Sequence, residues 1–432
     1  MATLRIYHIG PIDEVCVELN KVNVFIGPQS SGKSTINKVA CFCTWVEKQV
    51  ALDQSFDYFL QDGIFIQRLI TFHKMDGYFR QDSEIEYRSE VVEFSFRYSD
   101  KVPHFKWVNQ FAYVRTKISY IPAERNIVSM ISDWKQVNLP NNNIFNFMSD
   151  WNVARKKYTP ENGLDISYLH AQYYYDERED MDYLKVGENC KIRLIDASSG
   201  QQSLTPLYVL LNYFLQSVYE KEEVDNIQNE DRQKKLFNLF FLKSIADVKE
   251  RKDWERMDKD AVENLIESFV NIDEQREEKV QISANGVKFA KSLGGYMNHY
   301  FMTNYSSLFI EEPELNLFPS TQKEVVYYML TELKKRDHRL FITTHSPYIL
   351  YALNNCMIGG QVQDNLPDEV KASLNSKDAW IDPSLVSAWQ IRNGKIESIQ
   401  DRIVKGIDKH YFNEVMGDIM DEYYVLLNYL QV

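Results

Sequence analysis

The segment GPQSSGKS at residues 27–34 constrains the fold of this chain more than any other feature. It has the spacing G-x-x-x-x-G-K-[ST] and follows the apolar run VNVFIG at 22–27, which is typical of a buried strand. A helical pattern begins near Lys33. In such a strand–loop–helix unit, backbone N–H groups and the helix N-terminus present partial positive charge to phosphates. The sequence therefore predicts an α/β fold with a phosphate-binding loop.

The residue types of this loop suit separate tasks. Glycines let the backbone curl, Lys33 would place a full charge at the β- and γ-phosphate oxygens, and the Ser34 hydroxyl would bind Mg²⁺. A glycine-rich turn without a ligand is the alternative, which the strand–loop–helix context disfavours. The candidate nucleotide-binding residues are Gly27, Pro28, Gln29, Ser30, Ser31, Gly32, Lys33, Ser34 and Thr35.

Two later apolar runs end in polar residues, as strands do when their tips form a site. LFIEEPE (308–314) ends in Glu311 and Glu312, and FITTHSP (341–347) contains His345. We expect Glu311 to orient Mg²⁺ through water and Glu312 to act as the general base on the attacking water. An imidazole N–H of His345 would sense the γ-phosphate. A lone histidine is more often a surface group, but its place after the carboxylate strand favours the functional interpretation.

A fourth segment, DASSGQQS at 196–203, is by itself an ordinary helix cap. We expect it to open a helix at Ser203 or Thr205, with the helix established after Pro206. The order along the chain is then phosphate loop, capped turn, carboxylate strand and histidine strand.

The remaining pattern divides the chain into an N-terminal part (1–206), a helical insertion (207–285) and a C-terminal part (286–432). Alternating apolar residues predict an antiparallel β lobe, residues 126–175 look mostly helical, and a C-terminal helix follows the last hairpin. The expected strands and hairpins lie at 3–8, 14–19, 90–98, 104–108, 117–123, 183–195 and 386–399.

The insertion contains neither glycine nor proline between Leu207 and Asn285, and residues 220–279 hold 18 acidic and 12 basic side chains. A net negative surface does not release counterions from DNA. We therefore expect this arm to dock a protein or to support oligomerisation. Its apolar face would consist of Val262, Leu265, Ile266, Phe269 and Val270.

The bulk properties exclude several classes of protein. A net charge of −13 disfavours a basic DNA-coating protein, so a DNA contact is not indicated by charge. No run of 18 apolar residues and no secretory N-terminus is present, so we expect a cytoplasmic protein without membrane contact. The five cysteines form no C-x-x-C pair, which disfavours a disulfide framework or a zinc site.

Together the four motifs resemble those of ABC-type ATPases of the OLD and SMC-like branch, which are P-loop NTPases. The resemblance implies that the chain hydrolyses ATP with Mg²⁺ as a homodimer or higher oligomer. It also implies that Ser199, Gly200 and Gln201 contact the γ-phosphate held by the opposite subunit. Three departures stand out: Glu311 replaces the aspartate of transporters, Asn316 stands where relatives often have histidine, and no Q-loop glutamine is assigned.

OLD nucleases carry a TOPRIM domain after the histidine strand, but only 87 residues follow His345 and the Glu…Asp-x-Asp pattern is missing. The chain is therefore similar to the stand-alone ATPase subunits of anti-phage systems such as PARIS and Septu. This implies a sensor or scaffold that controls a separate effector protein, for which a nuclease is one candidate. The alternative is a DNA-repair or chromosome-maintenance ATPase that clamps DNA directly. A transporter subunit is disfavoured by the length of the chain. The segment YIPAERN (120–126) resembles one that ATPases of the OLD and SMC-like branch also carry, but it has no assigned role.

Overall fold

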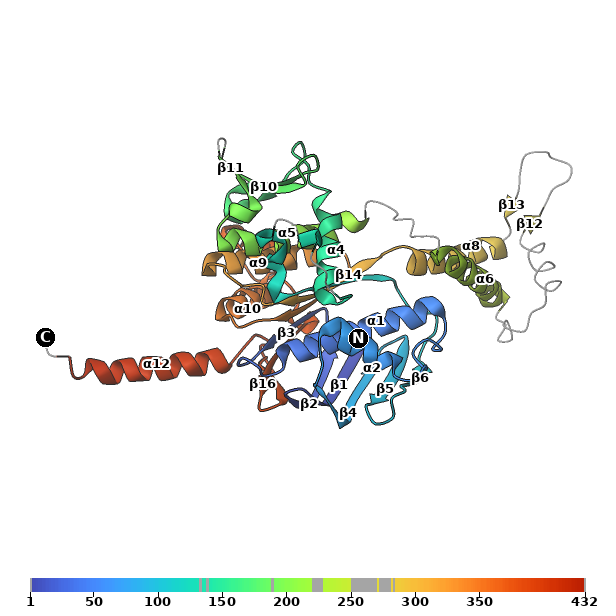
Figure 1. Ribbon diagram of the computed structural model, residues 1–432, viewed down its shortest axis with the longest axis horizontal. Helices are drawn as coiled ribbons and strands as arrows, with labels where there is room; N and C mark the ends of the chain where they lie inside the picture. Colours follow the sequence, from blue (N-terminus) through green and yellow to red (C-terminus); the bar gives the residue numbers. More distant parts are fainter. Residues whose placement is uncertain are drawn as a thin grey trace.

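The computed structural model describes residues 2–131, 134–136, 140–187, 190–219, 228–249, 270–271, 281–282 and 284–430. Its main unit is an 11-stranded mixed sheet (Figure 1). The strands of this sheet are β1 Ala2–Ile9, β2 Ile12–Leu19, β3 Val22–Ile26, β4 Phe79–Arg88, β5 Val92–Arg97, β6 His104–Trp107, β7 Thr116–Ile121, β14 Tyr305–Glu311, β15 Arg339–Thr343, β16 Val386–Arg392 and β17 Lys395–Ser398.

The strand order is β6-β5-β4-β1-β2-β17-β16-β3-β15-β14-β7. Strands β16, β3, β15, β14 and β7 pair in parallel, and β3 and β14 are buried along their whole length. This explains why most of their residues are apolar, because both faces of a parallel sheet are covered; the exceptions include Asn23 in β3 and Ser306 and Ser307 in β14. Strands β1, β2, β4, β5 and β6 pair antiparallel, and in β1, β2, β4 and β5 buried residues alternate with half-buried or exposed ones. The predicted α/β class with an antiparallel β lobe is confirmed.

Helices cover both faces of the parallel strands (Figure 1). One face carries α4 Asn143–Arg155, α5 Ser199–Leu215, α9 Pro319–Leu333 and α10 Pro347–Val362, and the other carries α1 Lys33–Asp53 and α2 Ile64–His73. Because side chains alternate along a strand, Val24, Ile310 and Ile342 belong to the core under α5. Their neighbours Phe25, Phe309 and Phe341 belong to the core under α1. The sheet therefore separates α1 from α5.

The prediction that residues 126–175 are mostly helical holds as far as Arg155 and is wrong beyond it. Beyond α4 and the short α3 Ile127–Met130, this stretch contributes β8 Leu164–Ile166 and β9 Ala171–Asp176. With β10 Met181–Val186 and β11 Cys190–Arg193 they form a second sheet in the order β11-β10-β9-β8, so the hairpin expected at 183–195 is confirmed. The tyrosine run in β9 favours a strand, and buried Tyr173 packs on Trp151 of α4 with ring centroids 5.8 Å apart.

The expected start of the helix after DASSGQQS is also wrong. Helix α5 begins at Ser199, and Pro206 lies inside it. The Ser198 side chain caps the helix and Gln201 reaches back to the Ser198 backbone, which forms a capping box. Residues 207–215 continue the helix within the core of the head.

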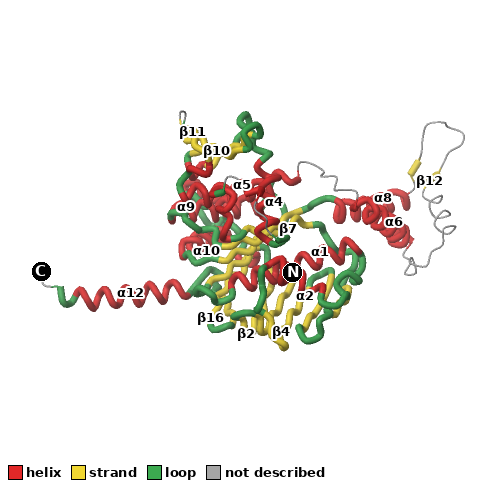
Figure 2. Tube along the Cα trace, viewed as in Figure 1, coloured by secondary structure: helices red, strands yellow, loops and turns green. Residues whose placement is uncertain are grey.

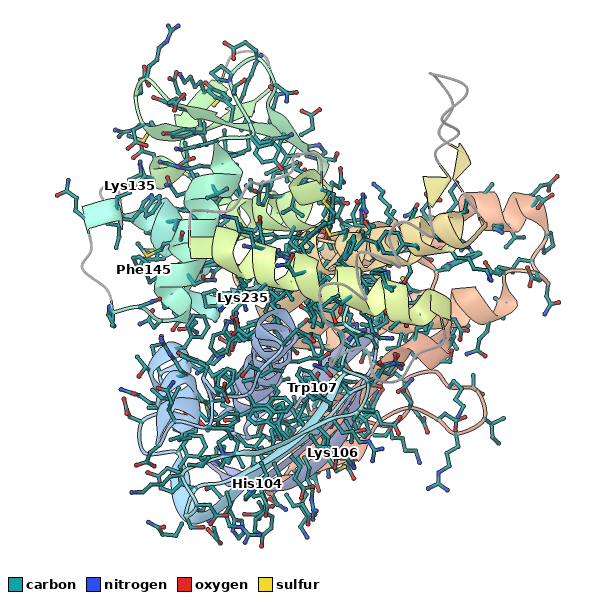
Figure 3. All side chains as sticks on the ribbon, turned by 90° about the vertical axis from the view of Figure 1, so that its right-hand side faces the viewer. His104, Lys106, Trp107, Lys135, Phe145 and Lys235 are labelled. Atoms are coloured by element: carbon teal, nitrogen blue, oxygen red, sulfur yellow. The ribbon has the colours of Figure 1, made fainter. Side chains whose placement is uncertain are left out.

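The described parts of the insertion are helical. Helices α6 Gln228–Lys249 and α8 Ala284–Phe301 pack against each other beside α1, and Figure 3 shows Lys235 on the exposed side of α6. Phe240 of α6 is buried against Tyr300 of α8, with ring centroids 4.5 Å apart. Most of the predicted apolar face (262–269) lies outside the described residues. Val270 begins β12 Val270–Asn271, which pairs with β13 Gln281–Ile282.

The C-terminal region follows the sequence pattern. Asn393 and Gly394 both have positive φ in the β16–β17 turn, as an Asn-Gly hairpin requires. Between α10 and β16 lies the short helix α11 Asp368–Ser373. Helix α12 Tyr411–Leu427 then projects from the body, as Figure 2 shows, and its apolar side chains, such as Ile419 at 58%, are exposed. None of the described helices is long and apolar enough to cross a membrane.

Candidate functional site

The phosphate loop connects β3 directly to α1, and its glycines are required by geometry. Gly27 has φ 153° and Gly32 has φ 105°. A Cβ atom at Gly32 would lie 2.3 Å from Cδ1 of Ile12, and one at Gly27 would lie 2.9 Å from the Ile391 carbonyl oxygen. A side chain at Gly27 would therefore press on the backbone of β16, one at Gly32 would displace the Ile12 side chain, and both would strain the positive φ angles.

Lys33 lies inside the loop. Its Nζ donates hydrogen bonds to the carbonyl oxygens of Gly27 (2.8 Å) and Pro28 (2.7 Å). Burial lowers the pKa of Lys33 to about 8, although the carboxylates of Glu312 and Glu314 act in the opposite direction. The loop thus orients the ammonium group, and an anion could bind it by replacing the two carbonyl oxygens as acceptors.

The other loop residues lie around this ammonium group. Gly27, Gly32 and Thr35 are buried, while Ser31 and Ser34 are half-buried. The tip of the loop, Pro28, Gln29 and Ser30, is exposed.

Glu311 is the last residue of β14, next to the histidine strand in the sheet. Its side chain is buried, and the Tyr120 hydroxyl of β7 donates to its Oε1 at 2.6 Å. A hydroxyl from Ser34 is an oxygen ligand that Mg²⁺ accepts, and a carboxylate such as that of Glu311 can hold a water molecule of the Mg²⁺ shell. The donor set therefore fits Mg²⁺.

Glu312 adopts the left-handed backbone conformation, with φ 44°. This conformation costs a non-glycine residue about 1 kcal/mol or more. The Glu312 backbone N–H donates to the Thr343 carbonyl of β15 at 2.9 Å, which holds the turn. The Glu312 carboxylate is consequently turned out of the sheet and partly open to solvent.

His345 follows β15 and faces this carboxylate. Its Nε2 lies 3.4 Å from Glu312 Oε1, and its backbone N–H donates to Glu314 Oε1 at 2.6 Å. Burial lowers the pKa of His345, the charge of Lys33 lowers it further, and Glu312 raises it. The structure therefore brings Lys33, Glu312 and His345 from three motifs into one electrostatic environment.

Arg125 was not singled out from the sequence, although it belongs to YIPAERN, and it connects the site to the rest of the head. Its guanidinium is fully buried and follows β7 in the 3₁₀ helix η1 Ala123–Asn126. It donates to the backbone carbonyls of Glu311 (3.0 Å) and Glu312 (2.9 Å), and to that of Ser203 in α5 (3.1 Å). Burial lowers the pKa of Arg125 to about 10, so it remains charged at neutral pH. A motif search cannot detect such a residue, because its partners are backbone atoms.

The capped turn of α5 lies apart from the phosphate loop. Ser199 is exposed, and Gly200 and Gln201 are half-buried. Among the described residues, no hydrogen bond or ion pair joins these three to residues 27–35. The start of α5 instead meets the loop after β14, where Asn316 Nδ2 donates to Ser203 Oγ at 2.9 Å. The predicted site residues thus form two groups in one chain.

A cavity of about 560 Å³ adjoins the phosphate loop. It is bounded by the exposed loop residues, by the β1–β2 and β16–β17 turns, and by Tyr411 at the start of α12. The ring of Tyr411 offers an aromatic surface to a planar group beside the phosphates. Tyr411 was not predicted from the sequence, since no motif surrounds it.

No protein-family model matches the chain, and no curated protein matches it. Among solved structures, the SMC head domain from Thermotoga maritima aligns at 9% identity over 93% of this chain and 98% of that chain, with a TM-score of 0.35. The recombination mediator RecF in its ATPrS form aligns at 11% identity over 92% and 97%, with a TM-score of 0.29. A dimeric ATP-binding cassette with ADP and Pi aligns at 9% identity over 93% and 100%, with a TM-score of 0.26.

Because these TM-scores are low, the fold class is defined by the order of the strands in the chain's own sheet. The histidine strand β15 lies between the phosphate-loop strand β3 and the carboxylate strand β14, with β7 beyond. This parallel order, with the antiparallel lobe on one side and the α5 unit on the other, is a P-loop NTPase fold with an ABC-type head.

Proposed function

We propose that this chain is an ABC-type ATPase that binds ATP with Mg²⁺ and hydrolyses it at composite sites shared by two copies of the chain. The observation that carries the proposal is the meeting of Lys33, Glu312 and His345 at the carboxyl edge of the parallel strands. One positive group, one carboxylate and one imidazole at that edge are what phosphoryl transfer to water requires.

Each residue has a defined role in this proposal. Lys33 exchanges its bonds to the Gly27 and Pro28 carbonyls for bonds to phosphate oxygens. Ser34, and Glu311 through water, hold Mg²⁺, which supplies positive charge to the β- and γ-phosphates. Glu312 accepts the proton of the attacking water, while a neutral His345 donates its Nε2–H to a γ-phosphate oxygen. The contact between His345 and Glu312 loosens as the γ-phosphate enters.

The Ser199–Gly200–Gln201 group acts on a second copy of the chain. The sheet separates α5 from α1, so these residues serve a nucleotide on the facing subunit. In a twofold arrangement, two nucleotides are then enclosed between two heads. The cavity beside Tyr411 accommodates the nucleoside.

The finer proposal is that the ATPase is a sensor or scaffold that controls a separate effector in anti-phage defence. It is supported by the resemblance of the four motifs to the PARIS and Septu ATPase subunits. The α6–α8 pair and the exposed part of α12 beyond Tyr411 lie outside the nucleotide site and offer surfaces for another protein.

The test is co-purification of this chain with the product of the neighbouring gene, with and without ATP. We expect ATP turnover in the parent chain, none in Lys33→Ala, and retention of the neighbour's product that depends on ATP. ATP-dependent capture of DNA, without retention of the neighbour, would favour the DNA-clamping alternative. An inactive parent chain would contradict the ATPase itself.

A further inference from the structure

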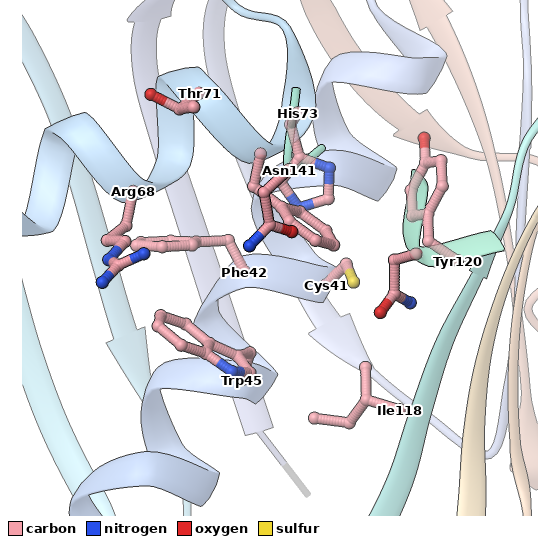
Figure 4. Close-up of a pocket in the computed structure, with 11 residues that line it drawn as sticks. Cys41, Phe42, Trp45, Arg68, Thr71, His73, Ile118, Tyr120 and Asn141 are labelled. Atoms are coloured by element: carbon pink, nitrogen blue, oxygen red, sulfur yellow. The ribbon is translucent and has the colours of Figure 1, made fainter. Parts of the chain in front are cut away.

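A second cavity, of about 260 Å³, lies between α1, α2 and β7, outside the residues proposed to bind nucleotide (Figure 4). Phe42 and Trp45 of α1 line it, as do His73 at the end of α2 and Tyr120 of β7. An apolar cavity of roughly 150 Å³ already holds benzene. This cavity therefore has room for one ring or two fused rings.

His73 is a polar residue of this cavity whose ring lacks hydrogen-bond partners. Its side chain is fully buried, and neither Nδ1 nor Nε2 has a hydrogen-bond partner. Burial, assisted by the charge of Lys38, lowers the pKa of His73, so the ring is neutral and offers one donor and one acceptor. A buried polar atom without a partner is costly, and here two belong to one ring.

The rest of the lining selects the kind of molecule. The aromatic rings suit a planar π-system, and the amides of Asn141 and Asn146 add donors and acceptors. Arg68 is the one charged residue of the lining; it is exposed, and its Nε donates to the Tyr58 hydroxyl at 2.5 Å. The interior therefore favours an uncharged ring that carries hydrogen-bonding nitrogen atoms.

We propose that this cavity binds a small, uncharged, planar nitrogen heterocycle of the nucleobase class, held by His73 between aromatic walls. The ligand communicates with the ATP site through Tyr120. The His73 and Tyr120 ring centroids are 5.2 Å apart, and the Tyr120 hydroxyl bonds Glu311. Occupancy would therefore shift the carboxylate assigned to Mg²⁺, and this regulatory part rests on the proposed ATPase function.

Calorimetry on the full chain without ATP tests the binding site. The probes are adenine, guanine, cytosine and uracil, and the corresponding nucleosides separate a free base from a base with its sugar. We expect at least one of these compounds to bind in a 1:1 ratio. His73→Phe keeps a flat ring but removes both nitrogen atoms, so it should weaken binding about 10-fold or more. The matched control, His104→Phe on exposed β6, should bind like the parent.

The same variants separate a ligand site from a buried structural histidine. If ordered water satisfied His73, His73→Phe would melt below the parent; we expect it to melt at or above the parent temperature. Equal binding by parent and His73→Phe, a lower melting temperature, or no binding below about 1 mM by any compound would overturn the proposal. Binding only to a single-stranded oligonucleotide would also overturn it.

The regulatory part has its own readout. The bound compound should change the ATP turnover of the parent at least 2-fold and leave His73→Phe unaffected. Because binding is measured without ATP, an inactive ATPase leaves the binding result intact, whereas binding without any effect on an active ATPase would refute the coupling alone.

Discussion

At the scale of single residues, Glu312 carries the chemical step in this account. Its left-handed backbone directs the carboxylate toward His345 rather than into the sheet. Glu312→Gln retains the shape and the hydrogen bonds but cannot accept a proton. We expect ATP affinity to stay within about 2-fold while turnover falls by roughly 10²-fold or more. Parallel binding and single-turnover assays measure both, and turnover at the parent rate would refute the assignment.

Lys33 gives the site a pH dependence of known sign. Its pKa is about 8 in the nucleotide-free chain, and bound phosphates raise it, so ATP binding takes up a proton. Affinity must then fall as pH rises through 8, and the Kd of a non-hydrolysable analogue should be about 10-fold higher at pH 9 than at pH 7.

The control for this pH profile is Lys33→Arg, which stays charged over the whole range and should show a flat profile if it binds. Lys33→Ala should lose binding. A parent Kd that is equal at pH 7 and pH 9 would show that the ammonium does not titrate in this range.

Much of the site could be predicted from residue types, because Lys33, Glu311, Glu312 and His345 follow strands whose apolar runs are easily recognised. The structure places three of them together, while their catalytic and Mg²⁺ roles stay predictions. Tyr120 and Arg125 could not be predicted. Their significance depends on strand β7 lying beside β14, and that pairing joins residues far apart in the sequence.

At the scale of secondary-structure elements, Arg125 links η1, the end of β14 and α5. Its removal would take a charged donor away from the carbonyl groups of Glu311, Glu312 and Ser203 and leave a cavity in the core. We expect Arg125→Ala to lower the free energy of unfolding by about 3 kcal/mol or more, measured by urea denaturation. Arg125→Lys can donate to fewer acceptors, so its free energy of unfolding should lie between those of the parent and of Arg125→Ala.

A purely structural role for Arg125 would lower stability alone. If Arg125 also aligns the two motif groups, Arg125→Lys should reduce turnover at a temperature where it remains fully folded, with unchanged affinity for ATP. Parent stability in Arg125→Ala would contradict the described network.

The insertion is the element that the proposed function assigns to protein contacts. Deleting residues 220–279 removes 18 acidic and 12 basic side chains and leaves residues 27–35 and 305–345 in place. We expect ATP binding to persist while oligomer size or retention of the effector changes. Native mass measurement checks this, and an unchanged assembly would exclude the docking role.

Element predictions failed where two local signals conflicted. The sequence around Pro206 suggested a late helix start, but the Ser198–Gln201 capping box begins α5 seven residues earlier than that proline. Likewise, we expected helix as far as residue 175, but Pro160 and Gly163 separate α4 from strands β8 and β9. In both cases a local signal, the capping box or the Pro–Gly break, set the boundary of the element.

At the scale of the whole molecule, the sheet keeps the two groups of predicted site residues apart. The phosphate loop belongs with the core under α1, and the Ser199–Gly200–Gln201 group belongs with the core under α5. In the proposed function, neither group is sufficient for ATP hydrolysis within one chain. If ATP hydrolysis requires two copies of the chain, the specific ATPase activity should rise with protein concentration in the range below the dissociation constant of the dimer.

The most direct test of this composite site mixes two inactive chains. Lys33→Ala cannot hold ATP but keeps the α5 turn. Gly200→Asp should still hold ATP, but it adds a negative charge at a position where the new Cβ would lie 3.1 Å from the Asn316 carbonyl oxygen. A mixed dimer pairs the normal phosphate loop of one chain with the normal turn of the other. The account predicts that ATP turnover, absent in each variant alone, returns on mixing, whereas parent chain that stays fully active as a dilute monomer would contradict it.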